Sequence, residues 1–234
     1  MNHRNFLDEL NESSYLISMT PAEAVIRIGH DAGMKKGQRI LDLCCGYGEM
    51  LKLWHEAFGI SGVGVDISAE FILDGRRRLQ GTDVELILSD IFQWQTDEKF
   101  DYVCLSGEQF GGMRGTLNLL EQYVKPNGKL IIGTRYSKVE NPPKELIDFE
   151  GETLPLVELN RIFLERGYFL TAMSSDTDIE WERYIMWSAR RNLAALRADP
   201  SNAEMRAWTL KWYDMYFKVR REYEGYATFV LEKL

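Results

Sequence analysis

Apolar residues along this chain of 234 residues fall into short runs bounded by turn residues, separated by longer segments with helical spacing. Short apolar runs rich in Val, Ile and Leu are typical of buried strands, and apolar positions three and four residues apart are typical of amphipathic helices. The alternation of the two predicts an α/β fold with a mostly parallel sheet. The predicted strands lie within 39–43, 62–66, 84–91, 100–107, 125–133, 168–174 and 227–232.

Several helices follow from the same pattern. Thr20 as an N-cap and Pro21 in the first turn predict a helix through about residue 32, and Thr153 is expected to cap a helix over 154–166. Residues 136–152 are polar and contain prolines, which predicts a loop. Two amphipathic helices are predicted before the last strand, over 179–198 and 202–223, separated by Asp199-Pro200-Ser201.

The first strand leads into the most informative stretch of the chain, Arg39-Ile-Leu-Asp-Leu-Cys-Cys-Gly-Tyr-Gly-Glu49. Glycines at 46 and 48 let a tight turn bring its N–H groups close to a ligand at a helix N-terminus, and Asp66 ends the next strand, where a carboxylate can accept ribose hydroxyls. This is the pattern of a nucleotide-cofactor site. The dinucleotide fingerprint G-x-G-x-x-G fails, because Leu51 occupies the position of its third glycine.

The stretch instead resembles the first motif of class I methyltransferases that depend on S-adenosylmethionine (SAM). Residues 40–43, Cys45, Gly46 and Gly48 match that motif, and Cys44 departs from it. The resemblance covers roughly residues 35–135 in the order that the family requires. It implies a doubly wound, seven-stranded sheet whose last strand is antiparallel. The expected organisation is one domain over 1–234, with an N-terminal helical flap over 1–33 and a helical insert over about 178–224.

The resemblance also implies roles for individual residues. Asp66, 18 residues after Gly48, would bind the ribose hydroxyls. Asp90 would bind the adenine amino group, with Ile91 against the ring, and Ser106 at the end of the fourth strand would lie beside the methyl donor. The cofactor-binding residues implied for SAM are therefore Asp42, Cys44, Gly46, Gly48, Asp66, Ile67, Asp90, Ile91 and Ser106.

Composition narrows the partners. The net charge of −8 argues against a broad phosphate-binding surface, so nucleic acid is an unlikely partner, although basic residues outnumber acidic ones between Trp181 and Glu222. No long apolar run or signal peptide is present, which predicts a soluble, cytoplasmic protein that does not bind membranes. Three isolated histidines and three cysteines without ligand spacing predict no metal site, and the cysteines are expected to be reduced.

The resulting hypothesis is a methyltransferase that moves the SAM methyl group to a small molecule. Glu108, just beyond the fourth strand, is the candidate general base. Weaker candidates for acceptor contacts are Tyr136, Glu182, Arg183 and Tyr184. The alternatives are an RNA or protein methyltransferase, a SAM-binding protein without transfer activity and, least favoured, a dehydrogenase. Whether the chain is a monomer or a homodimer stays open.

Overall fold

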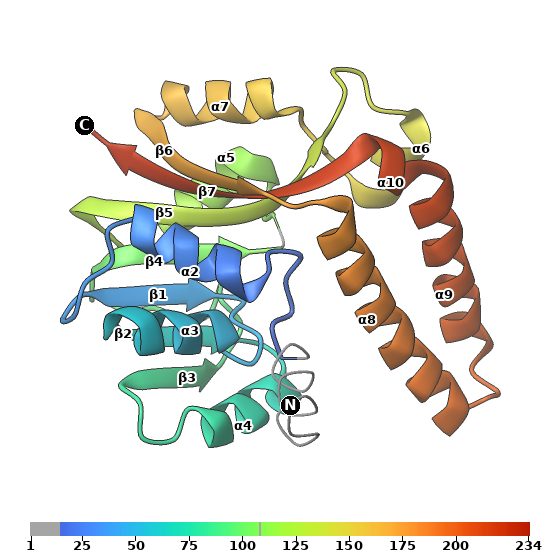
Figure 1. Cartoon of the computed structure of the whole chain (residues 1–234), viewed down its shortest axis with the longest axis horizontal. Coiled ribbons are helices and arrows are strands. Elements are labelled where there is room, and N and C mark those ends of the chain that lie inside the picture. Colours follow the sequence, from blue (N-terminus) through green and yellow to red (C-terminus); the bar gives the residue numbers. More distant parts are fainter. Residues whose placement is uncertain (1–14, 108) are drawn as a thin grey trace, which may run out of the picture.

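A seven-stranded sheet forms the centre of the computed structural model, which describes residues 15–107 and 109–234 (Figure 1). The strands lie in the order β3-β2-β1-β4-β5-β7-β6. Their bounds are β1 Arg39–Leu43, β2 Ser61–Asp66, β3 Val84–Leu88, β4 Phe100–Ser106, β5 Val124–Ser137, β6 Tyr168–Ser175 and β7 Glu224–Lys233.

Strand direction matches the expectation for the family. Strands β1 to β5 pair in parallel, whereas β7 is antiparallel to both β5 and β6. The strand order reverses between β1 and β4, and in doubly wound sheets ligands bind at the carboxyl ends of the strands beside such a switch point. The predicted fold class is therefore confirmed.

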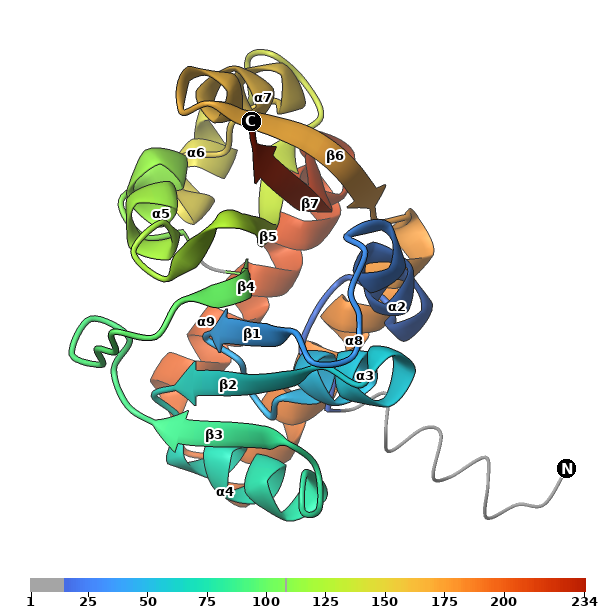
Figure 2. The same cartoon turned by 90° about the vertical axis from the view of Figure 1, so that its left-hand side faces the viewer.

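Helices cover both faces of the sheet (Figure 2). One buried cluster packs α2, α3 and α4 against the sheet, and the other packs α5 and α7 against the opposite face. The bounds of these helices are α2 Ala22–Asp31, α3 Glu49–Phe58, α4 Ala69–Arg78, α5 Gly112–Leu120 and α7 Leu156–Glu165.

Some local predictions were wrong. The loop expected over 136–152 instead contains the end of β5 and a short helix, α6 Lys144–Glu150. Thr20 does not cap α2, because its hydroxyl lies 2.9 Å from that of Thr228 on β7. Thr153 does not cap α7 either; its hydroxyl donates to the Gly151 carbonyl. In both places the threonine meets a partner outside the helix that sequence spacing does not reveal.

The predicted helical insert before the last strand is present and lies beyond the carboxyl ends of the parallel strands (Figure 1). It consists of α8 Asp178–Ala198, α9 Ala203–Met215, a π-helical turn over Tyr216–Arg220 and α10 Arg221–Tyr223. A third buried cluster, which includes Trp181, Tyr216 and Tyr226, joins the insert to β7.

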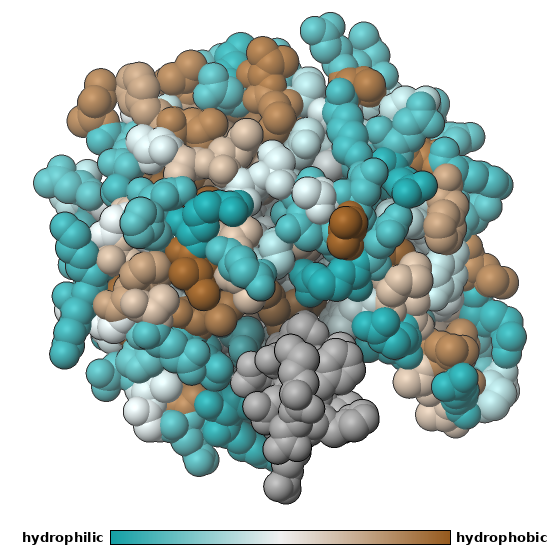
Figure 3. Space-filling model, in the orientation of Figure 1, coloured by the Kyte–Doolittle hydropathy of each residue, from teal (hydrophilic) through white to brown (hydrophobic). Residues whose placement is uncertain are grey.

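The surface seen in Figure 3 is mostly hydrophilic, with apolar groups in small separate patches. No helix in the described part of the chain is both long and apolar enough to cross a membrane.

Candidate functional site

The loop between β1 and α3 is tied to the end of β2. Gly46 has a φ of 57°, and its N–H donates to Asp66 Oδ2 at 2.8 Å, while Asp66 Oδ1 accepts from Ser68 N, also at 2.8 Å. Ser68 caps α4, since its hydroxyl accepts from Phe71 N. One carboxylate therefore fixes both the glycine loop and the start of α4.

A cavity of about 270 Å³ opens at this edge of the sheet. Five of the predicted cofactor-binding residues line it, namely Asp42, Cys44, Gly46, Asp66 and Ser106. The other lining residues come from the segment before α2, from the loop after β1, from α3 and α4, from the residue after β4 and from the insert. They are Tyr15, Leu16, Ile17, Cys45, Glu49, Met50, Phe71, Gly107 and Tyr184.

Asp42 gives this cavity an unusual titratable group. Burial raises the pKa of its carboxyl to about 7, the Cys104 thiol opposes this shift by hydrogen bonding, and the nearby negative charge of Asp66 adds to it. The Asp42 carboxyl and the Cys104 thiol lie close together because Asp42 pairs with Cys104 in the register of β1 and β4. A cationic ligand would stabilise the ionised form of Asp42 and so bind more tightly once that group loses its proton.

The cavity is covered by the segment that precedes α2. Tyr15 packs edge-on against Tyr47 with ring centroids 5.0 Å apart, and the guanidinium of Arg78 lies 3.7 Å from the centre of the Tyr15 ring. On the other side, Arg183 of α8 donates to the Ser18 carbonyl at 2.9 Å. The covering segment over 15–19 is thus held by both the core domain and the insert.

Ser106 at the end of β4 contacts the last strand. Its hydroxyl oxygen lies 2.7 Å from that of Tyr226, which is buried on β7. Gly133 of β5 pairs with Ser106, and a Cβ at this glycine would come within 2.4 Å of the Tyr226 hydroxyl and 2.5 Å of the Ser106 hydroxyl. Glycine at this position is therefore needed for the two hydroxyls to meet.

Other predicted cofactor residues lie outside the cavity lining. A Cβ at Gly48 would meet Leu79 and Leu86, so this glycine serves packing. Ile67 is 73% exposed, Ile91 is buried in the core, and Asp90 Oδ1 accepts from Phe92 N at 2.9 Å. Their roles toward the adenine and ribose stay predictions. Glu108, the candidate base, lies outside the described residues.

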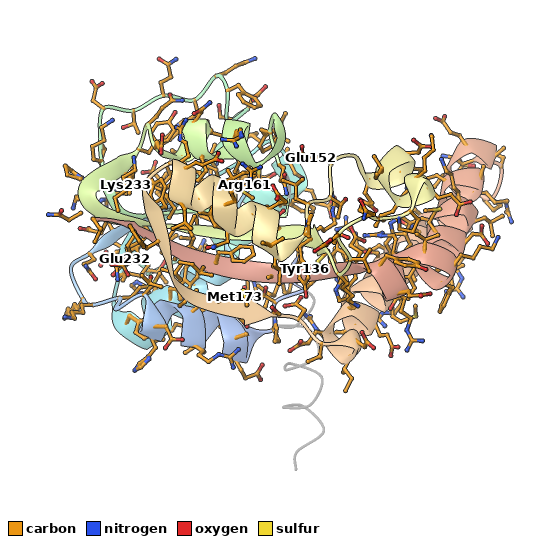
Figure 4. The ribbon with its side chains drawn as sticks, turned by 90° about the horizontal axis from the view of Figure 1, so that it is seen from above. Tyr136, Glu152, Arg161, Met173, Glu232 and Lys233 are labelled. Atoms are coloured by element: carbon orange, nitrogen blue, oxygen red, sulfur yellow. The ribbon has the colours of Figure 1, made fainter. Side chains whose placement is uncertain are left out.

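The four candidates for acceptor contacts have different surroundings. Tyr184 lines the cavity, and Arg183 holds its covering segment. Glu182 instead pairs with Arg221 at 2.9 Å on the surface of the insert. Tyr136 packs against Gly225, at the end of β5 that approaches the insert, opposite the end where Glu232 and Lys233 lie (Figure 4).

The residues present suit SAM, which carries a sulfonium and an ammonium group. Three carboxyl groups, from Asp42, Glu49 and Asp66, line the cavity and in their ionised form would attract these cations. Gly107 has a φ of 116°, and apart from its chain neighbours no heavy atom of the described residues lies within 4 Å of the place where its Cβ would be, which leaves space for a ligand beside the end of β4.

Known proteins agree with this geometry. A family model described as "Methyltransferase domain" matches residues 40–128. The uncharacterized protein YjhP of Escherichia coli K12 is 32% identical over 223 residues, covering 89% of this chain and 90% of that protein. Its X-ray structure is similar to this chain with a TM-score of 0.87 at 30% identity, covering 95% of this chain and 98% of that one.

Two further structures were determined with S-adenosylhomocysteine (SAH) bound, and both are SAM-dependent methyltransferases. The protein from Geobacter sulfurreducens has a TM-score of 0.86 at 27% identity, with 94% of each chain covered. The chain belongs to the class I SAM-dependent methyltransferases. The structure from Thiobacillus denitrificans gives a TM-score of 0.85, also at 27% identity with 94% of each chain covered. SAM is the cofactor of this methyltransferase, and the recognition made from the loop motif is confirmed.

Some residues of this methyltransferase site were not predicted. Glu49, on the first turn of α3, contributes to the cavity lining although its side chain is only 6% exposed and pairs with Arg78 at 2.9 Å. Its position directly after the glycine loop is the signal that could have identified it. Phe71 and Tyr226 carry no such local signal, because only the packing of α4 and the pairing of β7 bring them to the site.

Proposed function

We propose that this methyltransferase transfers the SAM methyl group to a small molecule. The observation that carries the proposal is that the cofactor cavity is walled by the insert and by the segment before α2. Tyr184 of α8 and residues 15–17 all line it. A small acceptor can pass such walls more readily than a folded RNA or protein can.

The charges of the insert also favour a small acceptor over RNA. Several of its basic side chains are engaged within the protein: Arg191 pairs with Glu70, Arg221 with Glu182 and Lys218 with Asp214. Arg183 binds backbone carbonyls, and Arg220 is buried between glutamates. Arginines and lysines that are already paired within the protein bind phosphates less strongly than the number of basic residues in the sequence indicates.

Methyl transfer requires the protein chiefly to align the cofactor and the acceptor. In the transfer, a lone pair on the acceptor forms a bond to the methyl carbon, the methyl–sulfur bond breaks, and neutral SAH leaves. Holding the three atoms in line in a dry site can supply roughly 7 to 11 kcal/mol. A base is needed only where the acceptor must lose a proton, and Glu108 stays the candidate.

The test is incubation of the purified protein with methyl-labelled SAM and a bacterial extract, followed by separation of small molecules from RNA and protein. Label in the small-molecule fraction supports the proposal. Label in RNA or protein overturns it in favour of a macromolecular methyltransferase. Tight SAH binding with no label transferred from any extract instead indicates a SAM-binding protein without transfer activity.

A further inference from the structure

A second cavity, of about 150 Å³, lies between the insert, α6 and β5. Tyr184 lines both this cavity and the cofactor cavity, so the two are neighbours across one side chain. The other residues that line the second cavity are Met19, Arg135, Phe149, Glu150, Trp208, Trp212 and Arg220.

Strand register places this second cavity close to the end of β4. Ser106 pairs with Gly133 on β5, and Arg135 follows two residues later, about 7 Å further along the strand. Arg135 in turn pairs with Tyr226, whose hydroxyl contacts Ser106. A molecule in the second cavity would therefore have one end near the place where the fold holds the methyl donor.

Aromatic side chains form much of the wall. Phe149 and Trp208 stack with ring centroids 5.7 Å apart and an interplanar angle of 15°, and Trp212 and Tyr184 contribute two more rings. A cavity of about 150 Å³ is large enough for benzene. The shape and lining fit one planar ring or an apolar group of similar size.

The charged groups at the cavity form a cluster of two arginines and two glutamates. Arg135, Arg220 and Glu150 line the cavity, whereas Glu224 does not. Arg135 pairs with Glu150 at 2.9 Å through Nη1 and with Glu224 at 3.5 Å through Nε. Both contacts of Arg220 with glutamates run through Nε, at 2.7 Å to Glu224 and 3.0 Å to Glu150. A guanidinium has four more N–H donors on its terminal nitrogens, and these suit a carboxylate.

We infer that the second cavity binds the methyl acceptor, and that the acceptor is a molecule of about one ring that carries a carboxylate. This rests on the proposed function. The carboxylate is bound by Arg135 and Arg220, and the ring packs against Trp208 and Trp212. The opposite end of the molecule then faces Tyr184 and the cofactor cavity. The carboxylate is therefore not the methylated group, and the product keeps its negative charge.

Benzoate, benzamide and benzylamine are matched probes, because they share the ring and differ in charge. Their binding to the SAH-saturated protein is measured by titration calorimetry, with tryptophan fluorescence as a second readout. Benzoate is expected to bind at least about tenfold more tightly than benzamide or benzylamine. Equal or tighter binding of either other probe, or no benzoate binding, overturns the inference.

Variants locate the probe. Arg135→Gln is expected to lower the affinity for benzoate about tenfold and to leave the affinity for benzamide unchanged. Trp208→Ala, at a side chain that is 53% exposed, should lower the affinity for both probes. Arg206→Gln, an exposed arginine on the same helix as Trp208, is the control and should change neither. Arg135→Gln is preferred to a change at Arg220, because both arginines pair with Glu150 and Glu224 but 26% of the Arg135 side chain is exposed, against 3% for Arg220. If Arg135→Gln leaves the affinity for benzoate unchanged, benzoate binds elsewhere and the inference is contradicted.

The labelled product from the extract experiment separates this inference from the proposed function. A labelled small molecule that an anion exchanger retains at neutral pH, and whose formation benzoate inhibits, supports both. A labelled small molecule that is not retained supports the proposed function and overturns the inference about the acceptor. Label only in RNA or protein overturns both, even if benzoate still binds.

Discussion

Asp66 accepts a hydrogen bond from the backbone N–H of Gly46 at 2.8 Å, although Gly46 lies in the loop after β1 and Asp66, 20 positions later, ends β2. The carboxylate at the end of β2 therefore shapes the glycine loop that follows β1. A carboxylate in this position has two consequences for the cofactor, since it holds the loop and also faces the cavity.

We expect Asp66→Ala to lower SAH affinity by more than tenfold, because it removes both the loop contact and the carboxylate that the family uses for the ribose. Calorimetric titration measures the effect. Asp83→Ala, at an exposed aspartate before β3, should bind SAH as the unchanged protein does. Unchanged affinity in Asp66→Ala would remove Asp66 from the site.

Asp90→Asn tests the adenine side separately. Asp90 does not line the cavity, and its Oδ1 accepts from Phe92 N. If the family role holds, its second oxygen accepts from the adenine amino group, and an amide in its place should weaken SAH roughly tenfold, as expected for loss of a hydrogen bond to a charged group. Asp97→Asn, at an exposed aspartate beyond the same strand, is the control. Equal affinities for the two variants would contradict the assignment.

The pKa of Asp42 predicts a pH dependence of stability. Since the folded value of about 7 lies above the ordinary 3.8, the folded state keeps a proton that the unfolded state releases between about pH 4 and 7. The free energy of unfolding should therefore fall as pH rises through this window, by a few kcal/mol at most, because one pKa unit corresponds to about 1.4 kcal/mol.

In Asp42→Asn the free energy of unfolding should fall less as pH rises, because an amide does not titrate. Urea unfolding at pH 4.5 and 7.5 measures this free energy for both proteins. SAH binding gives a second readout, since its ammonium group favours ionised Asp42, so affinity for the unchanged protein should rise with pH up to about 7 and that of Asp42→Asn should not. The same slope of stability with pH in both proteins would show that Asp42 titrates normally.

Sequence patterns predicted the part of the site whose residues lie close together in the chain. An apolar run, two glycines and a strand-ending carboxylate were enough to predict the glycine loop after β1 and the acidic residue that ends β2. The second cavity has no such pattern, because Arg135, Glu150 and Arg220 meet only through strand pairing and the packing of the insert. Helix α6 was missed because it has only 7 residues and follows two prolines, which indicate a loop.

Cys44 is the one departure from the family motif, and the structure shows what it costs. Its φ of 63° lies in the left-handed region that glycine adopts freely, whereas other residues are strained there by about 1 kcal/mol or more. Cys44→Gly should therefore be about 1 kcal/mol more stable than Cys44→Ala, since both lose the thiol and only alanine keeps the strain. Chemical denaturation measures the difference, and equal stabilities would argue that the loop relaxes around a Cβ.

Arg183 links the insert to the cover of the cofactor cavity. Its Nη2 donates to the Ser18 carbonyl at 2.9 Å, and residues 15–17 beside this contact line the cavity. Arg183→Met keeps much of the apolar length and removes the donors, so the covering segment should open more often. We expect faster amide hydrogen exchange over residues 16–20 and SAH affinity about five- to tenfold lower, through faster dissociation.

The matched change Arg197→Met lies near the end of the same helix at an exposed arginine and should alter neither exchange nor affinity. Exchange with SAH bound adds a second test, because a ligand beneath the cover should slow opening in the unchanged protein more than in Arg183→Met. Were both variants to bind SAH as the unchanged protein does, the contact between α8 and Ser18 would serve folding alone. The insert would then act on the acceptor side through Tyr184 and the second cavity, without controlling access to the cofactor.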